Sequence, residues 1–431
     1  MKDRMLQFLL LTAAAFLTLS YLSCAGTPRD AGPERELKEP FGFNHAGYRG
    51  EDETALLKKL GAGWVRLDIS WVRLQPEPGE FDFTYSDELL GKTEAAGVSV
   101  LGILDYDVPW IHDNPEGKRQ VNPDQLEYWL KYVEAVVLRY GDRLAALEIW
   151  NEPNFGKFWT GSDEDFFLLT RKTISLIREI APGTTIVAGS LMYNPFVGGP
   201  GYLKKMLASG AVEGADVISL HPYGISENAG SRRIEKARAL LDNYGFRGEL
   251  WITEMGYPTG GNYPHAVSPE LQGSHTVKAL VSSLAAGADR IIWYQLYDRY
   301  LPGENPAGCS SEAFFGVAYP DNSLKSGGEA ITRLAHVLRK STMVPELLAL
   351  KQPGNIPSVI YPFLDSEGII TAVAWSRFGR MEVELKGFRD GALIYETGTG
   401  KETVWHPGSL VSLSPEPLII RGDSSGGISF Q

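Results

Sequence analysis

The sequence predicts an α/β protein in which a (β/α)8 TIM barrel is followed by a small C-terminal β-sandwich domain. From residue 41 to about residue 340, eight short apolar runs alternate with eight amphipathic stretches, a pattern typical of βαβ units around a parallel sheet. After about residue 341 the period changes to short strand-like runs separated by turn residues, which indicates an all-β unit. The length of 431 residues suits both domains, because a barrel takes roughly 250 residues.

The barrel elements can be placed along the chain from their periodicity. Strands are expected at 41–44, 64–69, 99–104, 145–150, 185–188, 216–220, 249–253 and 290–296. Helices are expected near 53–60, 86–96, 123–140, 164–180, 202–208, 232–244, 269–286 and 329–338. For the third helix, Asn122 is the expected N-cap, Pro123 a first-turn residue and Gly141 the stop. A doubly wound open sheet is the alternative, but it usually carries a GxGxxG first turn, and this sequence has none.

The C-terminal strands are expected at 356–362, 368–375, 381–385, 392–395, 402–405 and 410–413. We assign residues 41–340 to the barrel and residues 341–431 to the β-sandwich.

The N-terminal segment resembles an export signal. Lys2 and Arg4 precede an apolar run at 6–22, and Ser23 and Cys24 follow it. Cys24 occupies the place of the lipidated cysteine in bacterial lipoprotein signals. We therefore expect residues 1–24 to be an export signal, lipidation of Cys24 to anchor the protein to a membrane, and residues 25–40 to be a flexible tether. Plain signal cleavage and an uncleaved anchor are the alternatives.

Composition excludes several classes of protein and site. The formal net charge is −12 and no run is rich in Lys or Arg, so a nucleic-acid partner is not expected. The chain has two cysteines, which excludes a disulfide framework. The seven histidines show no HExxH spacing and no GxSxG motif is present, so neither a metal site nor a serine nucleophile is predicted. We expect no cofactor, and the oligomeric state stays open.

Two glutamates end predicted strands that face each other across the barrel mouth. Glu152 follows the fourth strand and Glu254 ends the seventh, and the reacting groups of barrel enzymes lie at such strand ends. Either glutamate alone could form a salt bridge on the barrel rim. Together they fit the hydrolysis of a glycosidic bond, in which one carboxyl protonates the leaving oxygen and the other attacks the anomeric carbon.

The sequence around Glu152 resembles a known signature. Asn151-Glu152-Pro153, after a strand and Trp150, is similar to the acid/base motif of clan A glycoside hydrolases, in which a glutamate ending strand seven is the nucleophile. Residues 150–154 most resemble family 39, whose members also tend to carry a β-sandwich, and families 5 and 42 are near alternatives. Residues 71–83 resemble the loop after strand two in several clan A families. Asp68 departs from family 39 xylosidases, which often carry His there.

This resemblance implies roles for further residues. Glu152 would be the acid/base, Glu254 the nucleophile, and Asn151 a partner of the sugar 2-hydroxyl. Arg66 would keep Glu254 ionised, because a nearby cation lowers a carboxyl pKa. His221 and Tyr223 would lie beside Glu254, and Trp293 would form the floor under the sugar. The expected stacking rings are Trp110, Phe155, Phe158, Trp159 and Tyr263; packing between loops is the alternative for those on the third and fourth loops.

The leading functional prediction is a retaining glycoside hydrolase that cuts a β-linked exopolysaccharide internally. An exo-acting β-xylosidase-like or β-galactosidase-like enzyme is one alternative. A non-catalytic carbohydrate-binding protein on the same scaffold is the other. In each case the expected partner is a polysaccharide or an oligosaccharide.

Overall fold

The computed structural model describes residues 37, 39–44, 51–224, 227–263, 266–304, 306, 308–344, 347 and 358–430. The expected export signal at 1–24, including Cys24, and almost all of the tether at 25–40 lie outside the described residues. Among the helices of the described part, none is both long enough and apolar enough to span a bilayer.

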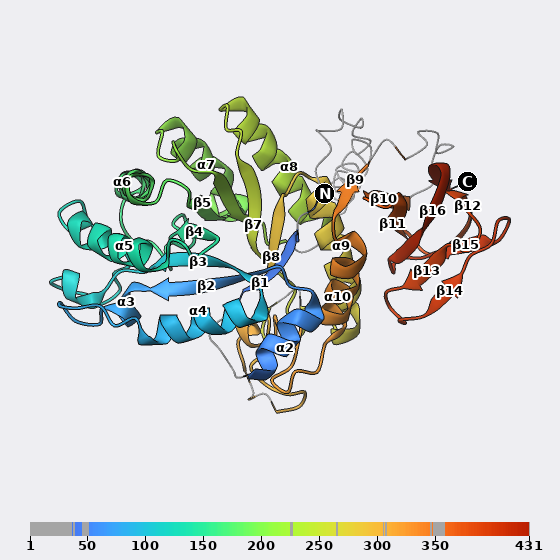
Figure 1. Ribbon diagram of the computed structural model, residues 1–431, viewed down its shortest axis with the longest axis horizontal. Coiled ribbons are helices and arrows are strands. Elements are labelled where there is room, and N and C mark those ends of the chain that lie inside the picture. The colour runs from blue at the N-terminus through green and yellow to red at the C-terminus, as the bar shows by residue number, and fades with distance from the viewer. Residues whose placement is uncertain are drawn as a thin grey trace, which may run out of the picture.

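Eight parallel strands form a closed barrel in the order β1-β2-β3-β4-β5-β6-β7-β8 (Figure 1), which confirms the predicted fold class. Their bounds are Phe41–Asn44, Trp64–Ser70, Ser99–Asp105, Ala146–Ile149, Thr185–Met192, Val217–His221, Glu249–Met255 and Arg290–Trp293. The fifth and seventh strands run beyond their predicted ends, and the eighth stops earlier. Register shifts in the β5–β6 and β7–β8 pairings accompany the two longer strands.

The helices of the outer layer are α2 to α10. Their bounds are Glu51–Leu60, Trp71–Leu74, Thr84–Ala96, Leu126–Tyr140, Asp163–Ile180, Gly199–Ala208, Glu227–Asn243, Pro269–Ala285 and Ser326–Leu338. Helix α5 begins at Leu126 with Gln125 as its N-cap, so the expected start at Pro123 is wrong. A turn closed by the bond from the Gln125 N–H to the Asn122 carbonyl occupies that position. Gly141 is the C-cap of α5, as predicted.

The barrel interior changes in chemistry along its axis. Its amino-terminal end is filled by an apolar layer of Trp64, Leu101, Ala146, Val187, Val217, Trp251 and Ile292. Nearer the carboxyl ends of the strands the buried side chains become polar, and they include Asn44, Arg66, Glu148, Ser190, Ser219, His221 and Thr253. Buried polar groups are costly unless they are hydrogen-bonded, so this end of the barrel is where the chain forms a site.

A separate antiparallel sheet domain follows the barrel and lies beside it (Figure 1). Its strands β9 to β16 span Ser341–Met343, Ser358–Asp365, Ile369–Ser376, Met381–Phe388, Leu393–Glu396, Glu402–Val404, Leu410–Leu413 and Leu418–Phe430. The sheet order is β14-β13-β16-β11-β10-β9, and β12 pairs with β15 and β16. The longest strand, β16, was not predicted, because its Gly- and Ser-rich stretch at 422–427 has the composition of a turn.

The C-terminal sheet has one face on the barrel and one face in a core of its own. Phe363, Trp375 and Ile419 join the apolar core of the barrel, and Arg421 donates a hydrogen bond to the Val337 carbonyl of α10. The second core contains Ile360, Ile370, Ala372, Ala374, Val383, Leu385, Phe388, Ala392, Ile394, Trp405, Val411, Leu413, Leu418, Ile420 and Ile428.

Candidate active site

A cavity of about 580 Å³ opens at the carboxyl ends of the barrel strands. Its volume lies in the range of pockets that hold small-molecule ligands. Its polar lining includes Asn44, Arg66, Asp68, Asn151, Glu152, Lys157, Asn194, Glu254, Gln295, Arg299 and Glu312. Its aromatic lining consists of Tyr106, Phe155, Phe158, Tyr223, Tyr263, Tyr294 and Phe315.

Glu254, near the end of β7, is held by two hydrogen-bond donors. Arg66 Nη1 lies 2.6 Å from its Oε1, and the Tyr223 hydroxyl donates to its Oε2 over 3.0 Å. Burial alone would raise the pKa of Glu254. The nearby His221 ring, the Arg66 guanidinium and the Tyr223 hydroxyl outweigh burial and hold this pKa below its ordinary value. Glu254 is therefore ready to act as an ionised carboxylate.

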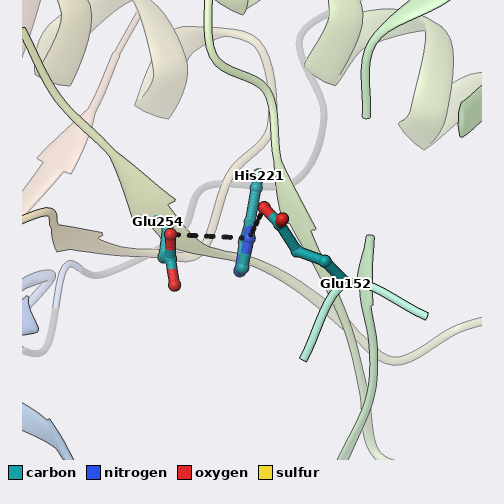
Figure 2. Close-up of side chains that lie close together, drawn as sticks. All are labelled: Glu152, His221 and Glu254. Atoms are coloured by element: carbon teal, nitrogen blue, oxygen red, sulfur yellow. Dashed lines mark hydrogen bonds and ion pairs between the residues drawn. The ribbon is translucent and has the colours of Figure 1, made fainter. Parts of the chain in front are cut away.

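Glu152 lies beyond the end of β4 in a backbone segment of unusual conformation. Both Trp150 and Glu152 have positive φ, 65° and 46°, a region that costs energy for residues with a side chain. The turn directs the Glu152 carboxyl toward His221, whose Nδ1 lies 2.8 Å from Oε1 (Figure 2). Burial raises the pKa of Glu152 and outweighs the opposing effect of the His221 ring, and the charge of Glu254 acts in the same direction as burial. Glu152 is therefore suited to carry a proton.

The two carboxyl groups lie on either side of the His221 ring (Figure 2). One oxygen of Glu152, one oxygen of Glu254 and one His221 nitrogen all lie within 4.8 Å of one another. Two neighbouring carboxyls with opposite pKa shifts form an acid and a base at the same pH.

Arg66 on β2 connects the polar end of the barrel. Its Nε donates to Glu148 over 2.6 Å, and Nη1 donates to Glu254 over 2.6 Å and to Asn44 over 2.9 Å. Nη2 donates to Asn151 over 3.0 Å and to Ser190 over 3.1 Å. All five N–H groups of the guanidinium therefore have acceptors, and this fixes the orientation of the cation.

The structure brings together most of the residues that the sequence analysis selected. Three of them contact a glutamate directly: His221 contacts Glu152, and Arg66 and Tyr223 contact Glu254. The fourth, Asn151, accepts a hydrogen bond from Arg66. Phe155, Phe158 and Tyr263 line the cavity as predicted.

Three expected sugar-contacting rings lie elsewhere. Trp293 is 1% exposed and packs toward Tyr257, while its neighbour Tyr294 lines the cavity in its place. Trp159 is buried against Trp150, and its indole N–H donates to the Ser162 carbonyl.

Trp110 packs edge-on against Trp71 and Tyr128, and its indole N–H donates to the Gln75 carbonyl. Packing between loops, the alternative weighed for Trp110 and Trp159, describes both rings. The expectation that Trp293, Trp159 and Trp110 contact sugar is therefore corrected.

Sequence reasoning missed several residues of the site. Tyr106 and Tyr294 follow directly after β3 and β8, so their position at strand ends was the available signal. Phe315 lies far along the loop after β8, where no pattern marks it. Glu148 and Thr253 lie within predicted strands, where a polar residue among apolar neighbours was a usable signal.

Two aspartates lie near Arg66, one on the same strand and one at the end of the neighbouring strand β3. Asp68 of β2 is exposed to the cavity, and Asp105 ends β3 with only 2% of its surface exposed. Within the described part of the chain, Asp105 Oδ1 has no hydrogen-bond partner. Burial first, and then the charge of Asp68, raise the pKa of Asp105 well above its ordinary value.

The grouping of Glu152, His221 and Glu254 has the residue types and spacing to hold a metal ion. Each of these groups has another partner, however: His221 pairs with Glu152, and Arg66 pairs with Glu254. A divalent cation would have to bind Glu254 beside the Arg66 guanidinium, and like charges at such a distance repel. The arrangement fits an acid and base pair better than a metal centre.

Comparisons with known proteins show which proteins resemble this chain. A family model described as Beta-galactosidase, of glycoside hydrolase family 42, matches residues 46–102. Beta-glucosidase 40 of Arabidopsis thaliana is 27% identical over 113 residues, which are 25% of this chain and 22% of that protein. The matched region thus spans about a fifth of the length of this curated relative.

Two solved structures resemble most of the chain. A family 39 glycoside hydrolase from the gut symbiont Bacteroides cellulosilyticus WH2 has a TM-score of 0.74 and 17% identity, covering 89% of this chain and 80% of the other. The GH39 enzyme from Xanthomonas axonopodis pv. citri has a TM-score of 0.63 and 14% identity, covering 91% and 95%. The chain therefore shares its fold with these glycoside hydrolases, and the resemblance to family 39 holds at the level of the fold.

Proposed function

We propose that this protein is a retaining glycoside hydrolase. The observation that carries the proposal is the pair of carboxyls on one cavity, with oxygens of Glu152 and Glu254 within 4.8 Å of each other. Retaining glycosidases place their two carboxyls about 5–5.5 Å apart, whereas inverting enzymes need about 6.5–9.5 Å to admit a water molecule. The 4.8 Å limit joins one oxygen of each carboxyl, and oxygens this close leave little room for a water molecule between the groups, which supports retention.

The opposite pKa shifts of the two glutamates match the first chemical step. Protonated Glu152 gives its proton to the glycosidic oxygen while ionised Glu254 attacks the anomeric carbon, so the glycosidic bond breaks as a glycosyl–Glu254 ester forms. In the second step Glu152, now a carboxylate, takes a proton from water. That water attacks the anomeric carbon and releases Glu254.

Asn151 is well placed to bind the sugar beside this reaction. Its Oδ1 accepts hydrogen bonds from Arg66 and Ser190 over 3.0 and 3.3 Å. The side-chain amide nitrogen is then the donor for the 2-hydroxyl, a contact that strengthens in the transition state of glycosidases.

We further propose internal cleavage of a β-linked polysaccharide. Aromatic rings line the cavity from loops that follow the strands of both glutamates: Phe155 and Phe158 come from the loop after β4, and Tyr263 and Phe315 from the loops after β7 and β8. Phe196, in the loop after β5, is 92% exposed next to cavity-lining Val197. Rings in these positions suit sugar units on both sides of the bond that breaks.

The export signal at residues 1–24 and the lipid anchor at Cys24 remain part of the proposal. An anchored exported enzyme would meet extracellular polymers. Cys24→Ser should release the protein from the membrane fraction, whereas retention there would contradict lipid anchoring.

The function is tested by two assays on the purified protein. Proton NMR of the hydrolysis of a panel of 4-nitrophenyl β-glycosides should show the β-anomer of the sugar as first product, and Glu254→Gln should abolish turnover. The α-anomer as first product would contradict retention. Absence of turnover with every glycoside and polysaccharide tested would instead favour a carbohydrate-binding protein.

A digest of β-linked polysaccharides, sized at early times, distinguishes the modes of attack. Internal cleavage should release oligosaccharides of several lengths. Release of monosaccharide alone would support the exo-acting β-xylosidase-like or β-galactosidase-like alternative.

A further inference from the structure

A further glutamate, Glu148, lies beneath the catalytic pair. Glu148, on β4 (Ala146–Ile149), is fully buried in the barrel interior. It accepts three hydrogen bonds: from Arg66 Nε over 2.6 Å, from the Ser219 hydroxyl over 2.6 Å and from the Thr253 hydroxyl over 2.9 Å. A carboxylate is the form that accepts from three donors at once.

Glu148 is not needed to balance the negative charge of Glu254. Arg66 carries one positive charge and faces two carboxylates, Glu148 and Glu254, each at 2.6 Å. Burying a second carboxylate against one cation is costly. The cost is understandable if Glu148 organises the site.

The first connection runs from Glu148 to the nucleophile. Glu148 holds the Nε edge of the Arg66 guanidinium, while Nη1 donates to Glu254. Because the guanidinium is planar and rigid, fixing one edge fixes the direction of the others.

The second connection runs from Glu148 through Thr253 to the acid/base. His221 Nε2 lies 3.1 Å from Thr253 Oγ1. The Thr253 hydroxyl has one hydrogen, and a carboxylate is a stronger acceptor than an imidazole nitrogen. That hydrogen therefore points to Glu148, and Thr253 offers only a lone pair to His221.

Ser190 supports the same assignment from another strand. Its hydroxyl lies 3.3 Å from both Asn151 Oδ1 and His221 Nε2. Since Asn151 Oδ1 is an acceptor, the Ser190 hydrogen points there, and Ser190 also offers a lone pair to the ring. Two lone pairs aimed at Nε2 require a proton on this nitrogen, as in the Nε2–H tautomer or the imidazolium.

The consequence for Glu152 follows from the other ring nitrogen. With the proton on Nε2, a neutral His221 has a bare Nδ1 that lies 2.8 Å from Glu152 Oε1 and 3.7 Å from Glu254 Oε2. A bare nitrogen repels an ionised oxygen and accepts from a protonated one, so this tautomer favours the acid form of Glu152. The charged and titratable groups that face His221 and Glu152 include Glu148 of β4, Glu254 of β7, Arg66 of β2 and Tyr223 after β6.

We propose that Glu148 is a positioning residue for both catalytic carboxyls: it orients Arg66 against Glu254 and, through Thr253, fixes the Nε2–H tautomer of His221 against Glu152. The assignment of the two roles rests on the proposed function, whereas the tautomer does not. A neutral ring removes the contribution of His221 to the lowered pKa of Glu254 and leaves Arg66 and Tyr223, both of which donate hydrogen bonds to this carboxylate.

The tautomer can be measured without substrate. In protein labelled with 15N-histidine, nitrogen–proton correlation spectra distinguish the two neutral tautomers and the imidazolium, and a His221→Gln variant assigns the resonances. At neutral pH the native protein should show a neutral His221 with its proton on Nε2. An Nδ1–H ring, or an imidazolium, would overturn the proposal.

Two pairs of variants separate positioning from packing. Thr253→Val and Glu148→Gln should move His221 toward Nδ1–H or imidazolium, and Thr253→Ser, which keeps the hydroxyl, should retain the native tautomer. Asp298→Asn is the matched control, because it disrupts another buried ion pair, 2.9 Å from Lys325, outside this network. If Thr253→Val folds and keeps the native tautomer, the relay through Thr253 is refuted even where Glu148→Gln does not fold.

The second measurement is the pH profile of kcat/KM. The substrate is the 4-nitrophenyl β-glycoside that the native protein hydrolyses best. In Thr253→Val and Glu148→Gln, an Nδ1–H that donates to Glu152 should lower the basic limb of the kcat/KM profile by about one pH unit. An unchanged basic limb in both variants would overturn the proposal. If the native protein hydrolyses no glycoside, the proposed function fails while the NMR result still decides the tautomer.

Discussion

Replacement of Arg66 by Met is the perturbation that most strongly tests the electrostatics of the site. The substitution keeps much of the side-chain volume and removes all five guanidinium hydrogen bonds. Glu148 and Glu254, with side chains 0% and 13% exposed, would then lack their cation. Removing one partner of a buried ion pair typically costs about 3–5 kcal/mol, and we expect a loss of this size in the free energy of unfolding.

The assay is equilibrium unfolding in urea at pH 7, with Arg247→Met as the matched control. Arg247 forms a surface ion pair with Asp242 at 3.9 Å, with side chains 78% and 55% exposed, and exposed pairs contribute about 0–1 kcal/mol. In Arg66→Met the pKa of Glu254 should also rise, so the acid limb of kcat/KM should move to higher pH. A loss below about 1 kcal/mol, or an unmoved acid limb, would refute this account of Arg66.

The remaining predictions concern the two proposed catalytic glutamates directly. The native kcat/KM should be bell-shaped in pH. Activity is lost below the lowered pKa of Glu254, because the nucleophile takes up a proton there, and above the raised pKa of Glu152, because the acid loses its proton there. A profile with only one limb would contradict the pairing. Glu152→Ala should still hydrolyse a 2,4-dinitrophenyl glycoside slowly and should be accelerated by azide, whereas Glu254→Ala should do neither; an identical azide response in both variants would mean that the roles are wrong. Dialysis against EDTA should leave kcat/KM unchanged, and a loss that Zn²⁺ or Mn²⁺ restores would show that Glu152, His221 and Glu254 bind a metal.

The sequence predicted the barrel well because its signal is local and repeated. Apolar runs alternate with amphipathic helices along the chain, and strand ends in a closed barrel converge on one mouth. This convergence is why the sequence alone predicts one site that contains Glu152, Glu254, Arg66 and Tyr223.

The predictions for Trp293 and Trp159 failed because they depended on the direction in which a side chain points. Trp293 ends β8 and Tyr294 follows it directly. The strand register at Trp293 decided which of the two rings enters the core and which lines the cavity. Trp159 was assigned to the cavity from its place in a loop, whereas that loop folds back onto the core through the Trp150 ring. Strand β16 was missed because its stability comes from pairing with β11, β12 and β13, which are distant in sequence.

The most direct test of the central claim is to trap the glycosyl–enzyme ester. The protein would be incubated with 2,4-dinitrophenyl 2-deoxy-2-fluoro-β-glycosides, which form the ester faster than it is hydrolysed, and the labelled peptide would be identified by mass spectrometry. We predict one sugar per chain, attached to Glu254, with no label in Glu254→Gln and a slower rate in Glu152→Ala. Labelling of Glu152, or hydrolysis of the parent glycosides with no label at any glutamate, would contradict the assignment of nucleophile and acid.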